Sequence, residues 1–246
     1  MGADVTTAPR FRSWAVTHPG TRRDHNEDSF VDRPDLGIWA VADGAGGHAA
    51  GEVASAMIAG ALAAIPAGLA AGELTAQVRL ALEQTHVALR EEAASRGPDV
   101  QIVSTVVVVL AGDGQFACLW AGDSRAYLLR AGELHQITRD HSLVQELLDA
   151  GAIRPDEALN HPRSNVITRA VGAGCDGLAL DEVTERLLPG DRFLLCSDGL
   201  CKALQDDALA DILGEPEGIP VQALIDGALA ANASDNVTAV AVEFTG

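Results

Sequence analysis

Short apolar runs alternate with longer segments of helical periodicity along the chain. Apolar or β-branched runs that end at turn residues are typical of strands. Strands are predicted over residues 11–17, 37–42, 102–110, 115–121, 125–130, 165–168, 192–197 and 237–244. Recurrence of apolar residues on one face predicts helices. Helices are predicted over residues 51–65, 72–95, 141–150, 206–213 and 220–231.

The order of these elements indicates an α+β fold. Three predicted strands follow one another between residues 102 and 130, which favours antiparallel pairing over a parallel sheet with alternating helices. No internal repeat or Pro- or Ser-rich linker divides the chain, so a single domain over 1–246 is expected. Residues 150–165 contain two prolines and no sustained period. They fit either a long surface loop or a flap beside a site.

Composition excludes several classes of partner. Seventeen Lys and Arg against 35 Asp and Glu give a formal charge of −18, which argues against nucleic acid and anionic membrane as partners. The Ala- and Gly-rich run 53–71 carries Pro66 and is interpreted as a buried helix, not a membrane span. The N-terminus lacks the apolar segment of a signal peptide. We therefore expect a cytoplasmic protein whose four cysteines are reduced.

Acidic residues recur where the predicted strands end. In GIWAVADGAGGHAAGE (37–52) an apolar strand leads into Asp and then into a burst of glycines. Four other places have a similar design: NED (26–28), AGDSR (121–125), CSDGL (196–200) and SDNVTAV (234–240). A single Asp-Gly is usually an ordinary turn, because glycine tolerates positive φ and Asp bonds to its own backbone.

Five acidic strand ends suggest more than turn chemistry. If the strands pack as sheets, their ends could bring several carboxylates together, and such groups repel one another unless cations intervene. Hard oxygen ligands of this kind suit Mg²⁺ or Mn²⁺. The glycines after Asp43 would let the backbone approach closely, and the Gly44 carbonyl could be a further ligand.

Seven motifs in order resemble one family. They are RxxNED (23–28), ADGxGGHxxGExAS (42–55), AGDSRAYLLR (121–130), ITRDHSLV (137–144), NVITRAVG (165–172), GDRFLLCSDGL (190–200) and SDNVTAVAV (234–242). The chain resembles the type-2C metal-dependent Ser/Thr protein phosphatases in their stand-alone bacterial form, over about residues 12–244. The resemblance implies a four-layer α-β-β-α sandwich of two antiparallel sheets flanked by helices, with a metal centre at one edge.

The resemblance also implies the ligands of that centre. Asp43 would bridge two Mn²⁺ or Mg²⁺ ions with help from the Gly44 carbonyl. Glu27 would bind one ion, and Asp198 and Asp235 the other. The remaining matches are Asp28, which would hold ligand waters in the second shell, and Asp123, which with Asp198 would hold a possible third ion.

Further implications concern the reaction and its partners. Arg23 matches the arginine that grips the substrate phosphate, and about 145–165 matches the family's flap. A water between two divalent ions would attack phosphorus directly, without a covalent enzyme intermediate. The substrates would be Ser/Thr-phosphorylated proteins, including a cognate bacterial kinase and its targets, and a monomer is expected. Compact relatives of this type sometimes accompany type VI secretion systems.

Two positions depart from the family pattern. Some members have a histidine directly after the Asp-Gly, proposed as the acid for the leaving oxygen, where this chain has Ala45. The proton must then come from elsewhere, and we interpret His48 as structural. At Ser104-Thr105-Val106 relatives often have Gly-Thr-Thr, a change that is not expected to abolish activity.

Two other functions compete with this interpretation. The run GAGGHA (44–49) matches the dinucleotide-binding fingerprint, but no acidic residue closes a second strand about 20 positions later. A catalytically inactive phosphoprotein-binding module of the same fold would usually have lost metal carboxylates, which are present here.

Three other features receive structural interpretations. Arg125 and Arg169 are expected to form salt bridges, and Asp140-His141-Ser142 is expected to cap a helix.

Overall fold

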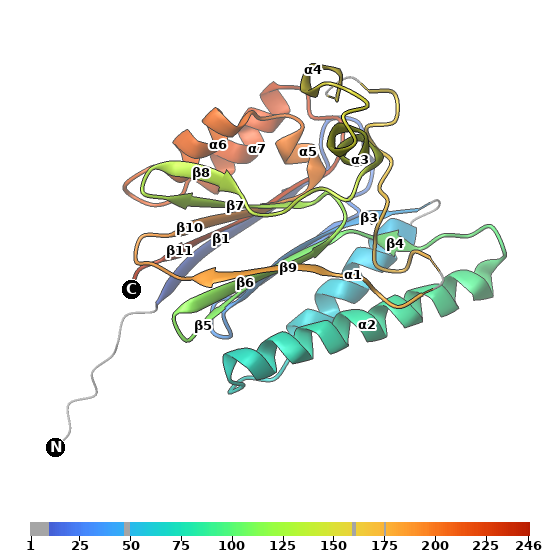
Figure 1. Ribbon diagram of the computed structural model, residues 1–246, viewed down its shortest axis with the longest axis horizontal. Helices are drawn as coiled ribbons and strands as arrows, with labels where there is room; N and C mark the ends of the chain where they lie inside the picture. The colour runs from blue at the N-terminus through green and yellow to red at the C-terminus, as the bar shows by residue number, and fades with distance from the viewer. Residues whose placement is uncertain (1–9, 47–49, 159–160, 175) are drawn as a thin grey trace.

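Two antiparallel β-sheets lie face to face, and helices cover the outer face of each sheet (Figure 1). The computed structural model describes residues 10–46, 50–158, 161–174 and 176–246. The predicted α+β sandwich of four layers is therefore confirmed. The layers follow from the sequence, because the central strands of both sheets are apolar on both faces and need cover on both sides.

The first sheet contains the two ends of the described chain. Its strand order is β1-β11-β10-β7-β8. These strands are β1 (Phe11–His18), β11 (Val237–Phe244), β10 (Arg192–Cys196), β7 (Arg125–Arg130) and β8 (Glu133–Gln136). The buried strand β11 pairs with both β1 and β10, which places the start of β11 beside the end of β10.

The second sheet has the order β2-β3-β5-β6-β9, with β4 paired to β3 off this path. Its strands are β2 (Asp28–Arg33), β3 (Ile38–Ala45), β4 (Val103–Ser104), β5 (Val106–Gly112), β6 (Gln115–Ala121) and β9 (Asp181–Arg186). The chain passes from β6 of this sheet to β7 of the first sheet at residues 122–124. That crossing point lies at the same edge as the end of β10, because Arg125 pairs with Cys196.

Helices form the two outer layers. The second sheet is covered by α1 (Ala50–Ala63) and α2 (Ala71–Arg96), whereas α5 (Asp198–Cys201), α6 (Asp206–Leu213) and α7 (Val221–Ala230) cover the first. The short helices α3 (Leu143–Asp149) and α4 (Pro155–Ala158) lie within residues 143–166, and we call this segment the flap because it includes the stretch to which the resemblance assigned one. None of the helices in the described ranges has both the length and the apolar character that a membrane crossing requires.

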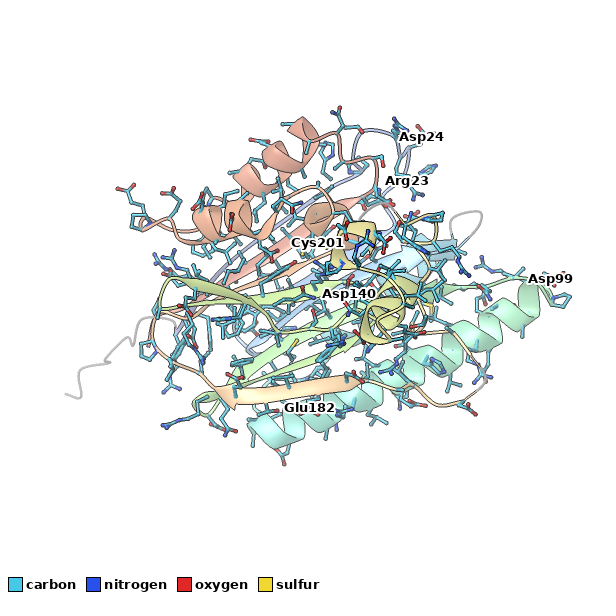
Figure 2. All side chains as sticks on the ribbon, turned by 45° about the horizontal axis from the view of Figure 1, so that its top comes forward. Arg23, Asp24, Asp99, Asp140, Glu182 and Cys201 are labelled. Atoms are coloured by element: carbon cyan, nitrogen blue, oxygen red, sulfur yellow. The ribbon has the colours of Figure 1, made fainter. Side chains whose placement is uncertain are left out.

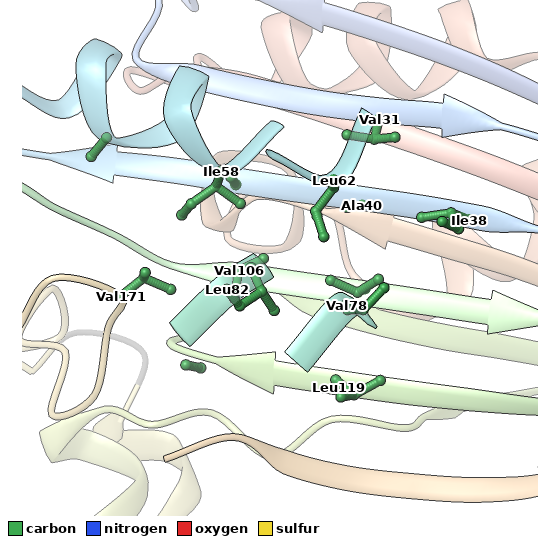
Figure 3. Packing of buried hydrophobic residues seen from close by; sticks show 14 of the residues in the cluster. Val31, Ile38, Ala40, Ile58, Leu62, Val78, Leu82, Val106, Leu119 and Val171 are labelled. Carbon is green, nitrogen blue, oxygen red and sulfur yellow. The ribbon is translucent and has the colours of Figure 1, made fainter. Parts of the chain in front are cut away.

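Three buried clusters hold the layers together. Between the sheets, Trp39, Phe116, Phe193 and Leu195 belong to one apolar cluster drawn from both. A second cluster joins the other face of the second sheet to α1 and α2, where Ile58, Leu62, Val78 and Leu82 point at the strands (Figure 3). The third joins the first sheet to α5, α6 and α7. This packing fixes the strand ends on which the candidate site is built.

Several element predictions are corrected by the structure. The predicted strand at 165–168 is wrong, since only an isolated bridge pairs Ile167 with Ser142. The predicted strand 102–110 is interrupted at Thr105, whose backbone N–H donates to the Asp43 carbonyl at 2.8 Å. The strands β8 and β9 and the short helices α4 and α5 were not predicted, and residues 150–165 are not one continuous loop.

Candidate metal centre

Six carboxylates lie where strands of both sheets begin or end, and we call them the carboxylate cluster. Asp28 opens β2 and is the register partner of Asp43 in β3. Asp123 lies between β6 and β7, and Asp198 follows β10 as the first residue of α5. The other two members lie in loops, Glu27 before β2 and Asp235 before β11. The sandwich thus places these six carboxylates at one edge, where the charges of Asp28, Asp123, Asp198 and Asp235 all act on Asp43.

Asp28 connects the two sheets. Its Oδ2 accepts hydrogen bonds from the Ser197 hydroxyl at 2.8 Å and from the Thr238 hydroxyl at 2.7 Å, both in or next to strands of the first sheet. Its Oδ1 is buried and has no hydrogen-bond partner among the described residues. Burial first, and then the charges of Asp198 and Asp235, raise the pKa of Asp28 to about 7.

Asp43 is the electrostatic centre of the carboxylate cluster. Burial raises its pKa well above the ordinary range, and the charges of Asp28, Asp198, Asp123 and Asp235 raise it further. Asp123 behaves similarly, because burial and then Asp198 raise its pKa to about 7. Negative charge at this edge is therefore incompletely balanced by protein groups.

Gly44 near the end of β3 and Gly51 at the start of α1 permit a close approach of three backbone segments. A Cβ on Gly44 would lie 2.0 Å from the Gly51 carbonyl oxygen at the start of α1, and one on Gly51 would lie 2.8 Å from Cδ of Glu27. The Gly44 N–H donates to the Glu27 carbonyl at 3.1 Å. Only residues without side chains allow Asp43, Glu27 and the start of α1 to meet here.

Two cations contact the carboxylate cluster. Arg23 Nη2 donates to Asp235 Oδ2 at 2.9 Å, and the Arg23 side chain is 50% exposed. Lys202 Nζ donates to Asp198 Oδ2 at 2.5 Å and to the flap residue Asn165 at 2.8 Å. Lys202 was not singled out from the sequence, although its place one helical turn after Asp198 is a signal for this ion pair.

Asn236 shapes the loop that carries Glu27. Its side-chain oxygen accepts from the Glu27 N–H at 2.8 Å, and its amide nitrogen donates to the carbonyls of Pro19 and His25 at 3.0 and 2.9 Å. Asn236 is only 5% exposed. The sequence marked it as a neighbour of Asp235 but gave no indication of this contact, which depends on the three-dimensional arrangement.

The carboxylate cluster is chemically suited to divalent cations, although its side chains are not arranged around a common metal position. As they are placed in the described ranges, no three His, Cys, Asp or Glu side chains form a group that could hold a metal ion. Asp198 and Asp235 are instead directed at Lys202 and Arg23. The buried Asp28 Oδ1, which no described residue contacts by a hydrogen bond, and the all-oxygen donor set nevertheless suit hard cations such as Mg²⁺ and Mn²⁺.

The structure also places other residues for which the sequence predicted a contact. Arg125 forms a salt bridge with Asp140, and Arg169 forms one with Asp181, as predicted. The Ser142 hydroxyl caps α3 by accepting from the Gln145 N–H at 3.2 Å. His48 and Cys175 lie outside the described residues. The thiols Cys118, Cys196 and Cys201 are free.

Two cavities give access to the edge of the sandwich at which the carboxylate cluster lies. One of about 520 Å³ is bordered by Asp123, the flap and the start of α6, and includes Cys201 and Asp140, both labelled in Figure 2. Another of about 240 Å³ is bordered by Asp198, Asp235 and Lys202. A ligand could therefore reach the carboxylate cluster from either side of Lys202.

Known proteins are similar to this chain in sequence and in architecture. The family model of protein phosphatase 2C matches residues 21–215. PppA, a key regulatory component of T6SS in Pseudomonas aeruginosa, has a solved structure that is 44% identical, with a TM-score of 0.86 over 95% of this chain and 97% of that one.

A mycobacterial protein is similar over the same region. Serine/threonine protein phosphatase PstP of Mycobacterium tuberculosis is 38% identical over 98% of this chain, which spans 46% of that protein's length. The solved catalytic domain of PstP, in complex with two manganese ions, is 36% identical. Its TM-score is 0.81 over 96% of this chain and 99% of that one.

Proposed function

Since this chain belongs to the protein phosphatase 2C family, we propose that it hydrolyses phosphoserine and phosphothreonine in proteins with the help of divalent cations. The observation that carries this proposal is the carboxylate cluster, in which burial and the charges of neighbouring aspartates raise the pKa values of Asp28, Asp43 and Asp123. That arrangement is costly to a fold unless cations neutralise it. The manganese-bound catalytic domain of PstP supports the same conclusion.

We assign the ligands from the positions of the carboxylates. Asp43 and the Gly44 carbonyl would serve two core ions, Glu27 would bind one of them, and Asp198 and Asp235 the other. Asp198 lies close enough to Asp123 for its charge to raise the pKa of Asp123, and these two residues would hold a third, looser ion. Mn²⁺ and Mg²⁺ both suit this set of oxygen donors.

When bound, such ions act as Lewis acids and lower the pKa of water toward neutrality, which supplies a nucleophile for the phosphate ester. Arg23 provides a planar fork of N–H donors that matches phosphoryl oxygens. Its half-exposed guanidinium is anchored by Asp235 and points at the same edge. Asp28 is fixed by Ser197 and Thr238, so its free Oδ1 is available to orient a water by accepting a hydrogen bond.

The biological setting is proposed from the relatives. The 44% identity to PppA supports a role in regulating a type VI secretion system by opposing a bacterial Ser/Thr kinase. The substrates would then be phosphorylated cytoplasmic proteins, and this chain would act on them as a monomer. An inactive binding module is less well supported, because Glu27, Asp43, Asp198 and Asp235 are all retained.

Phosphate release from a phosphothreonine peptide tests this function. We expect release with Mn²⁺ or Mg²⁺, none with a chelator, and at least a 100-fold loss of rate in Asp198→Asn. Asp211→Asn in α6 is the matched control, because it makes the same charge change on an exposed face. A folded, metal-loaded protein that releases no phosphate but still binds the phosphopeptide would favour the binding module.

A further inference from the structure

The cavity of about 520 Å³ beside the carboxylate cluster has apolar walls and an acidic end, and we call it the flap cavity. Val144, Leu148 and Ala158 of the flap contribute apolar surface, and Leu204 contributes more from the segment between α5 and α6. Asp123 lines the flap cavity and also belongs to the carboxylate cluster. A molecule bound at the cluster therefore has this cavity as its immediate neighbour.

The basic groups of the flap cavity are already paired with carboxylates. Arg125 donates through Nε and Nη2 to Asp140 at 2.8–3.2 Å, and it contacts the Tyr127 hydroxyl at 3.1 Å. Lys202 is paired with Asp198. Neither the Arg125 guanidinium nor the Lys202 ammonium is therefore free to bind an anionic ligand.

The carboxylates at the acidic end of the flap cavity are not paired in this way with basic groups of the described residues. Asp206 and Asp207, in the first turn of α6, line the flap cavity and are exposed. Neither side chain makes a hydrogen bond or ion pair with another described side chain. Asp123 is only 6% exposed, and Lys202, whose charge acts on it, is already engaged by Asp198. The flap cavity thus combines unpaired carboxylates with an aliphatic wall.

We propose that the flap cavity binds an arginine or lysine side chain that lies close to the phosphorylated residue of a protein substrate. The long methylene stem of such a side chain would cover Val144, Leu148 and Leu204, while its cationic head would reach Asp206 and Asp207. A glutamate at the same substrate position would be repelled by both carboxylates. This inference rests on the proposed phosphatase function and adds a sequence preference to it.

The test compares phosphothreonine peptides that differ at one position. Arginine, alanine or glutamate is placed in turn at each position from three residues before to three residues after the phosphothreonine, and kcat/KM is measured with Mn²⁺. We expect arginine to exceed alanine by about three- to tenfold at one or two positions, the size of one or two exposed ion pairs. Glutamate at those positions should fall below alanine.

Variants then locate the preference. The double change Asp206→Asn with Asp207→Asn should abolish the preference for arginine, whereas Asp211→Asn on the same helix should keep it. Turnover of p-nitrophenyl phosphate, which has no neighbouring residues, should be equal in all of these proteins. Thermal unfolding in parallel verifies that the double variant is folded at the assay temperature.

The outcomes separate the two proposals. Wild-type protein that turns over p-nitrophenyl phosphate but treats arginine, alanine and glutamate peptides alike at every position would overturn the flap-cavity inference alone. A preference that survives in the double variant would also overturn it. Loss of metal-dependent turnover of every substrate by wild-type protein would overturn the proposed function, and this inference with it.

Discussion

Asp28 shows how one carboxylate can be both a structural link and part of a reactive site. Through Oδ2 it ties β2 to Ser197 and Thr238 of the opposite sheet. Its Oδ1 is buried and has no hydrogen-bond partner in the part of the chain that the structure describes, which costs stability because a buried acceptor loses its hydrogen bonds to water. This is expected where a ligand supplies the missing contact.

The raised pKa values predict how pH affects the metal-free protein. In the folded protein the pKa of Asp28 and of Asp123 is about 7, whereas an unfolded Asp has a pKa of about 3.9. Between these values the folded state holds protons that the unfolded state has released, so the free energy of unfolding falls as pH rises from about 4 to 7. We expect a lower Tm in chelator at pH 8 than at pH 5.5.

Mn²⁺ should reverse this trend, because it replaces protons as the neutralising charge. Thermal unfolding at the two pH values, with chelator and with Mn²⁺, should show a larger gain in Tm from Mn²⁺ at pH 8. Asp28→Asn, which has no charge to neutralise at that position, should show a smaller loss of Tm between the two pH values in chelator. A Tm in chelator that rises with pH would contradict the account.

The sequence identified the carboxylates but not the groups that hold them. Glu27, Asp43, Asp198 and Asp235 stand in motifs that can be found by eye. Ser197 and Thr238 lie 169 and 210 positions from Asp28 in the chain. Such contacts depend on how the two sheets pack, and no local pattern contains that information.

At the scale of elements, two glycines allow β3 to pack against the start of α1. The Gly44 and Gly51 backbones are so close that a methyl group on either would overlap the other. Asp43 directly precedes Gly44, and the Glu27 side chain lies against Gly51. The close packing at these two glycines therefore decides where two carboxylates of the cluster lie.

Substituting Gly44 and Gly60 by alanine separates the effect of close backbone packing from the effect of replacing a glycine as such. Gly44→Ala should lower the free energy of unfolding by more than about 2 kcal/mol, because its Cβ would lie 2.0 Å from a backbone oxygen. Gly60→Ala in α1 meets nothing within 4 Å and should raise stability by up to about 1 kcal/mol. Urea unfolding measures both, and equal effects would show that close approach is not the cause.

The helices and buried strands were predictable because burial imposes a pattern on them. The prediction of a helix over 206–213 matches α6, and 72–95 differs from α2 by one residue at each end. β9, with the sequence DEVTER, is an exposed edge strand and carries no apolar signal. Val166 and Ile167 suggested a strand at 165–168, but Val166 is 43% exposed and Ile167 forms only an isolated bridge with Ser142.

At the scale of the whole molecule, the two sheets share one apolar interior that fixes the distance between their edges. Phe116 and Phe193 meet across it with ring centroids 4.8 Å apart. Asp28 and Asp43 belong to one sheet, whereas Asp198 and Asp235 flank strands of the other. The carboxylate cluster therefore exists only while the sandwich is closed.

Truncation of the apolar core between the sheets should thus be costly. Leu195→Ala in β10 removes a fully buried side chain between the sheets and should lower the free energy of unfolding by about 2–5 kcal/mol. Leu80→Ala in α2, where the residue is 49% exposed, should change it by less than about 0.5 kcal/mol. Denaturant titration of the two variants distinguishes them, and a loss in Leu80→Ala comparable to that in Leu195→Ala would contradict this assignment of the core.

The most direct test of the central claim is the position of bound metal. Anomalous diffraction from crystals grown with Mn²⁺ should show two strong peaks on either side of Asp43, with Arg23 and Lys202 moved away from Asp235 and Asp198. Asp198→Asn crystals should lose at least one peak. Wild-type crystals with peaks only elsewhere on this acidic surface would contradict the claim that the carboxylate cluster is the metal centre.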